Sequence, residues 1–151
     1  MFAAFKSLFE VAAEAPPTES QIQSSAALLL IEVAKADQSI EQDELQRIQE
    51  VLSEQWSLSS AEVDQLINDA TETAKWNASL HEHVELVNAY FSQAQKYQLV
   101  LGLWRVACAD QVIHHHEEHL VRRVADLLHV SHKDFIRSKH DALEKLIVIN
   151  D

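Results

Sequence analysis

Two pairs of carboxylates recur in this chain at the same spacing. Asp37 is followed seven residues later by Glu44, and Asp110 is followed seven residues later by Glu117. If the chain reverses between the members of a pair, both side chains face one turn, and two to four carboxylate oxygens there suit a hard divalent cation such as Ca²⁺ or Mg²⁺. The same residues also suit helix capping, because Asp in a turn and Glu in a first helical turn accept backbone N–H bonds. Both interpretations stay open on spacing alone.

The carboxylates belong to a longer repeat. Residues 34–40, Ala-Lys-Ala-Asp-Gln-Ser-Ile, match residues 107–113, Ala-Cys-Ala-Asp-Gln-Val-Ile, at a constant offset of 73 residues, and apolar positions on both sides match at that offset. Each copy has the pattern of an apolar helix, a short turn, an apolar anchor and a second helix. The sequence therefore predicts an internally duplicated helix–turn–helix unit.

A histidine cluster offers an alternative metal site. His115 and His119 lie four residues apart on one predicted helix face and could chelate Zn²⁺ or Ni²⁺. With Glu118 they also fit the inverted zinc-protease motif H-x-x-E-H. Only 32 residues follow His119, too few for a distal ligand helix and a substrate cleft, so we expect no enzymatic activity. The ordinary explanation of the cluster is a solvated polar helix face.

The composition predicts an all-α fold. The chain has one glycine and two prolines in 151 residues, too few for the tight turns of a β-rich protein. Capping-box patterns predict helix starts at five places, namely Thr18, Ser59, Ser79, Ser92 and Ser131. The helices before the repeated Asp are apolar nearly all round, so we expect them to be central, with the amphipathic helices after it peripheral.

The single glycine lies inside the second of these apolar helices. A glycine at such a position costs about 1 kcal/mol relative to alanine. Gly102 therefore indicates either room for close helix packing or a tolerated neutral residue.

The chain divides into a short amphipathic helix over residues 1–15 and a single helical domain over residues 18–148. Phe2, Phe5 and Phe9 share one face of the first segment, which Pro16-Pro17 ends. Membrane contact through residues 2–13 would lack attraction to anionic lipid, because Lys6 is the only base there. We expect this face to pack on the domain or on a second subunit.

The net charge and the cysteine content limit which partners and which cellular compartment we expect. The net charge of -12 repels phosphate backbones, which argues against nucleic acid and favours cations or basic protein surfaces. The single cysteine rules out an intramolecular disulfide and fits a reducing compartment. No secretory signal is evident. We expect a cytoplasmic protein that has a protein partner or self-associates.

The repeated Ala-x-Ala-Asp-x-x-Ile-x-x-x-Glu pattern resembles the TerB family of tellurite-resistance-associated proteins over most of residues 20–140. The family motif carries Gly after each Asp, where this chain has Gln38 and Gln111. The resemblance implies a compact bundle of about seven helices that binds a divalent metal ion through acidic residues. The matching residues here are Asp37, Glu44, Asp110 and Glu117.

The function expected from the resemblance is a non-enzymatic, stress-response-associated domain with a divalent metal ion. The alternative is a protein–protein interaction or oligomerisation module without a metal site, in which the acids are helix caps and surface charge.

Overall fold

The computed structural model describes residues 16–35, 40–77, 80–109, 113 and 115–150, with the backbone only at 73–77 and 145–150. The described residues form seven α-helices and no strand, which confirms the predicted all-α class. The N-terminal helix expected over residues 1–15 lies outside them. The helices are α2 (Glu19–Ala34), α3 (Gln42–Trp56), α4 (Ser60–Asn77), α5 (Leu80–Tyr90), α6 (Gln93–Ala107), α7 (His115–Leu127) and α8 (His132–Asn150).

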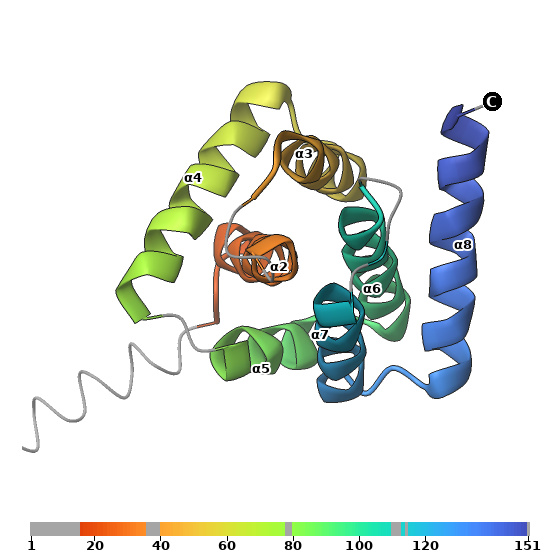
Figure 1. Ribbon diagram of the computed structural model, residues 1–151. Coiled ribbons are helices and arrows are strands. Elements are labelled where there is room, and N and C mark those ends of the chain that lie inside the picture. The colour runs from red at the N-terminus through yellow and green to blue at the C-terminus, as the bar shows by residue number, and fades with distance from the viewer. Residues whose placement is uncertain (1–15, 36–39, 78–79, 110–112, 114, 151) are drawn as a thin grey trace, which may run out of the picture.

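Helix α2 is the centre of the bundle. It packs against α3, α4, α5, α6 and α7, and Figure 1 shows it end-on with these helices around it. Helix α8 lies outside this ring and packs on α6. No helix within the described ranges is both long enough and apolar enough to cross a membrane.

Burial follows the predicted division into central and peripheral helices. Residues 25–31 of α2 and 99–107 of α6 are all buried, as expected for helices that are apolar nearly all round. Helices α3 and α7 each bury one face. The buried residues of these two faces correspond at the offset of 73: Glu44, Ile48, Val51 and Leu52 in α3, and Glu117, Val121, Val124 and Ala125 in α7.

Gly102 lies where α3 and α6 touch. A Cβ atom built on this glycine would stand 2.7 Å from Cγ1 of Val51 and 3.6 Å from Cδ2 of Leu30. Since 2.7 Å is well inside van der Waals contact, the missing side chain lets the two helices approach closely. The first interpretation of the glycine is therefore the correct one.

Where a predicted helix start lies among the described residues, the structure has the capping hydrogen bond expected there. In each of three cases the cap hydroxyl accepts a hydrogen bond from the third helical N–H, and that residue's side chain accepts one from the cap N–H. At the start of α8, Ser131 accepts from the Asp134 N–H at 3.1 Å. Ser79 lies outside the described residues. The three reciprocal pairs are Thr18 with Gln21, Ser59 with Glu62, and Ser92 with Gln95.

Candidate functional site

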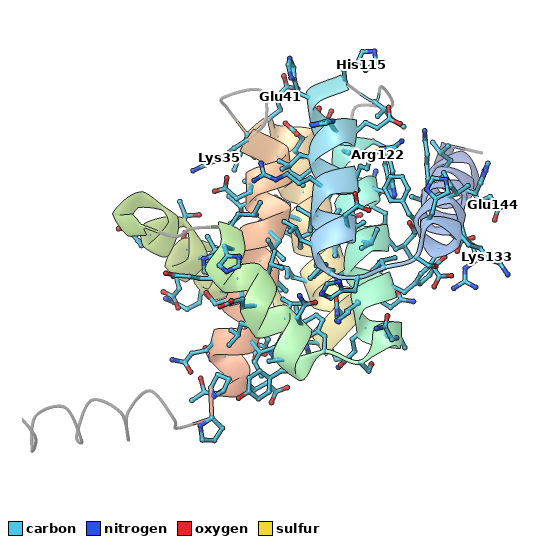
Figure 2. All side chains as sticks on the ribbon, turned by 90° about the horizontal axis from the view of Figure 1, so that it is seen from below. Lys35, Glu41, His115, Arg122, Lys133 and Glu144 are labelled. Atoms are coloured by element: carbon cyan, nitrogen blue, oxygen red, sulfur yellow. The ribbon has the colours of Figure 1, made fainter. Side chains whose placement is uncertain are left out.

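The described residues that flank the two repeated motifs lie at the same end of the bundle. The first turn lies between Lys35, which caps α2, and Glu41, which precedes α3; the second lies between α6 and His115, the first residue of α7. Figure 2 shows Lys35, Glu41 and His115 together at one end of the molecule. The topology thus gathers the flanks of both acidic motifs, which are far apart in sequence.

Glu44 is held in the first turn of α3 and is 5% exposed. Its Oε1 accepts a hydrogen bond from the backbone N–H of Glu41, with 3.1 Å between the nitrogen and the oxygen. Glu41 is the N-cap of this helix. Glu44 therefore serves as a capping residue, as expected if the repeated motif caps helices.

Glu117 occupies the equivalent position in the first turn of α7 and is 2% exposed. Carboxylates are almost never buried to this extent unless they are paired, hydrogen-bonded or coordinated. The next residue, Glu118, is half-buried and pairs with Lys139 of α8 at 3.2 Å. Two buried carboxylates at equivalent positions distinguish this end of the bundle, because within the described part of the chain no other acid is buried.

The two aspartates of the predicted site, Asp37 and Asp110, lie outside the described residues, as do Gln38, Gln111 and His114. Of the four predicted ligands, the structure places Glu44 and Glu117. Within the described ranges, no three or more His, Cys, Asp or Glu side chains gather in an arrangement that could hold a metal ion. A cation site at this end would need ligands from outside the described residues, and Asp37 and Asp110 stay the predicted ones.

The alternative histidine pair is on the surface. His115 and His119 are both exposed on α7, as a solvated polar face requires. Among the residues that the structure describes, neither belongs to a group of three or more metal-binding side chains. The spacing of His115 and His119 still predicts a metal chelate, but one with these two histidines as its only described ligands.

A groove between α3 and α6 was not predicted. It has a volume of about 400 Å³, and Val51, Trp56, Leu101 and Gly102 are among its lining residues. Arg105 also lines it. The sequence signal that could have found it is this arginine within the otherwise apolar run of residues 99–107, because a buried guanidinium needs a carboxylate partner.

The buried Arg105 forms ion pairs with two exposed carboxylates of α3. Its side chain is 9% exposed, with Nη1 at 2.7 Å from Oε2 of Glu54 and Nη2 at 3.7 Å from Oε2 of Glu50. These pairs join helices that are about 50 residues apart in sequence. Arg105 and Glu54 thereby place charged groups along one edge of the groove.

A second unpredicted contact joins α2 and α5. Nδ1 of His83 and the hydroxyl of buried Ser25 form a hydrogen bond at 3.2 Å. Burial lowers the pKa of His83 below its ordinary value, and the charges of Glu82 and Glu32 oppose that shift. The folded protein thus favours the neutral imidazole at this position.

Comparison with known proteins agrees with the family resemblance of the sequence. Neither the curated proteins nor the solved structures give a significant match to this chain. The family model of tellurite resistance protein TerB matches residues 23–140. This span covers most of the chain, including both repeats and the groove. The chain therefore belongs to the TerB family.

Proposed function

We propose that this TerB domain is a non-enzymatic binding module that holds a divalent cation at the end of the bundle where α3 and α7 begin. The observation that carries the proposal is the burial of Glu44 and Glu117 at equivalent positions in α3 and α7. Figure 2 supports it by placing the starts of both helices at one end.

Carboxylate oxygens favour a hard cation such as Ca²⁺ or Mg²⁺ over a soft one. Glu44 uses one oxygen for the Glu41 N–H, but a carboxylate has acceptor sites for several partners. Asp37 and Asp110 would supply the remaining protein oxygens. The net charge of -12 also favours a cation, because binding reduces the repulsion among the acids.

Glutamine substitutions separate a cation ligand from a helix cap. Glu44→Gln and Glu117→Gln keep a side-chain oxygen at the third helical position, where Gln also completes a capping box, but remove the charge that binds the ion. Glu62→Gln is the matched control, because Glu62 accepts from the Ser59 N–H at 3.1 Å in the first turn of α4, an exposed helix start outside the repeat.

Melting temperatures with and without Ca²⁺ or Mg²⁺ give the test. At a free-ion concentration of 100 times Kd, binding stabilises the folded state by about 2.7 kcal/mol, which is about 5–10 °C for a domain of this size. We expect that shift in the wild type and in Glu62→Gln, and its loss in the double variant Glu44→Gln/Glu117→Gln. The same shift in all three proteins would contradict the proposal.

A second candidate is a protein-interaction module without a metal ion. Its support is a hollow of about 370 Å³ between α3 and α4, whose lining includes Glu50, Glu54 and Asp64. Glu50 and Glu54 also pair with Arg105, but both stay exposed and no basic residue is among the residues lining the hollow, so it suits a basic segment of a partner. Absence of any cation-induced shift in the wild type would favour this function.

The cellular setting is part of the same proposal. We propose a cytoplasmic location, which the single cysteine supports, and a stress-response role, which the family's description as a tellurite resistance protein supports. Loss of tellurite tolerance on deletion of the gene would support the role, and unchanged tolerance would oppose it.

A further inference from the structure

The groove between α3 and α6 has the size and the polar lining of a small-molecule site. Gln55 and Trp56 of α3 line it, together with Gln98 and Gly102 of α6. Gln98 is exposed, whereas Gln55 and Trp56 are half-buried. The volume of about 400 Å³ falls within the range of about 300–1,000 Å³ that is typical of pockets for small ligands.

The charges in the groove favour an uncharged ligand. Arg105 and Glu54 both line it and pair with each other, with 2.7 Å between Nη1 and Oε2. Among the described residues that line the groove, no other carries a charge. An anion would be repelled by the net charge of -12 and by Glu54, which is 58% exposed. A cation would be repelled by the guanidinium of Arg105, so neither sign of charge is favoured.

The polar groups of the groove require a ligand that both accepts and donates hydrogen bonds. The side chain of Arg105 is 9% exposed, and its buried Nε has no acceptor within the described part of the chain. A buried donor without an acceptor is destabilising, so a ligand oxygen or nitrogen beside it is favoured. The amide groups of Gln55 and Gln98 each supply a further acceptor and further donors.

Trp56 supplies a stacking surface for a planar ring. Its indole contacts Phe91 edge to face, with 6.3 Å between the ring centroids, and this contact restricts its orientation. Heterocyclic bases stack on aromatic side chains of this kind. An uncharged planar ring that carries donors and acceptors along its edge therefore matches the groove.

We propose that the groove binds a neutral purine base, stacked on Trp56 and hydrogen-bonded along its edge to Arg105 and Gln98. Guanidinium groups donate to O6 and N7 of guanine, and amide side chains pair with purine edges. The site is separate from the proposed cation site, because Trp56 lies 12 residues along α3 from Glu44, a distance of about 18 Å in a helix.

A titration of the full chain with guanosine, followed by NMR, tests the proposal. Gly102 is the single glycine of the chain, so its backbone amide signal identifies the floor of the groove without ambiguity. Gln98→Ala removes one amide of the groove at an exposed helical position. Gln93→Ala is the matched control, because Gln93 is exposed on the same helix and does not line the groove.

We expect guanosine to shift the Gly102 signal saturably in the wild type and in Gln93→Ala with the same Kd. The Kd should rise about five-fold in Gln98→Ala, which loses a hydrogen bond, and about ten-fold in Trp56→Leu, which loses the stacking surface. Guanosine monophosphate, which carries the same base with a charged phosphate, should bind more weakly than guanosine at low salt.

Three results would overturn the proposal. The first is a Gly102 signal that guanosine does not shift in the wild type. The second is the same Kd in Gln98→Ala as in the wild type, a comparison that stays valid if Trp56→Leu does not fold. The third is binding of guanosine monophosphate as tight as that of guanosine at low salt, which would show that the groove does not select an uncharged ligand.

Discussion

Substituting Gly102 by alanine tests how closely α3 and α6 approach. Two effects oppose each other. Alanine favours a helix over glycine by about 1 kcal/mol. The new Cβ, however, would lie 2.7 Å from Cγ1 of Val51. Val51 is 4% exposed and β-branched, so its side chain has little freedom to rotate away. Overpacking of a well-packed core costs about 1–3 kcal/mol, and we expect the upper half of that range here.

The expected net result for Gly102→Ala is a loss of about 1–2 kcal/mol in the free energy of unfolding. Urea unfolding followed by circular dichroism measures this loss, and the melting temperature should fall by about 3–6 °C. Val51→Ala removes Cγ1 and thereby the clash. In that background, Gly102→Ala should stabilise the protein by about 1 kcal/mol, because only the helix preference remains. An increase in stability of Gly102→Ala in the wild-type background would refute the close approach of the two helices.

Three further predictions concern the cap of α6, the buried Arg105 and the half-buried His83. Ser92→Ala removes the acceptor for the Gln95 N–H and should cost about 1 kcal/mol in urea unfolding, whereas no change would contradict the cap. Arg105→Met should change the free energy of unfolding by less than about 1 kcal/mol, because an apolar side chain of similar size avoids the burial of a charge. Glu54→Gln leaves the guanidinium of Arg105 with Glu50 alone, at 3.7 Å, and should cost about 1 kcal/mol. Because the pKa of His83 is lowered by burial, the unfolded chain binds a proton more readily below pH of about 6.5. The stability that His83 contributes is therefore present above that pH and falls as the pH decreases. Between pH 7.5 and pH 5.5, the free energy of unfolding should fall less for the His83→Gln variant than for the wild type. An equal fall in both proteins would contradict a lowered pKa of His83 as the cause.

The helices and their order could be predicted because their signals are local. A capping box such as Ser92-x-x-Gln95 depends on residues three apart, and the structure contains both of its hydrogen bonds. The central and peripheral positions followed from the apolar pattern of each helix alone. The expectation of close packing at Gly102 was also correct, but its contact, Val51, could not be read from the sequence.

The contacts that the sequence did not predict join distant residues. Arg105 and Glu54 are 51 residues apart, and His83 and Ser25 are 58 apart. Which faces meet depends on how the helices cross, and no local pattern sets that. The candidate cation site was predicted as four residues. The structure places Glu44 and Glu117 in equivalent buried positions, and the contribution of the two aspartates stays a prediction.

We propose that the end of the bundle where α3 and α7 begin binds a divalent cation through Asp37 and Asp110 together with Glu44 and Glu117. The most direct measurement is a calorimetric titration of the full chain with Ca²⁺ and with Mg²⁺, for the wild type and for Asp37→Asn/Asp110→Asn. Asparagine caps a helix about as well as aspartate, so the variant should melt at nearly the wild-type temperature without metal. We expect saturable binding by the wild type and none by the variant. Equal binding by both proteins, or no binding by the wild type, would contradict the claim.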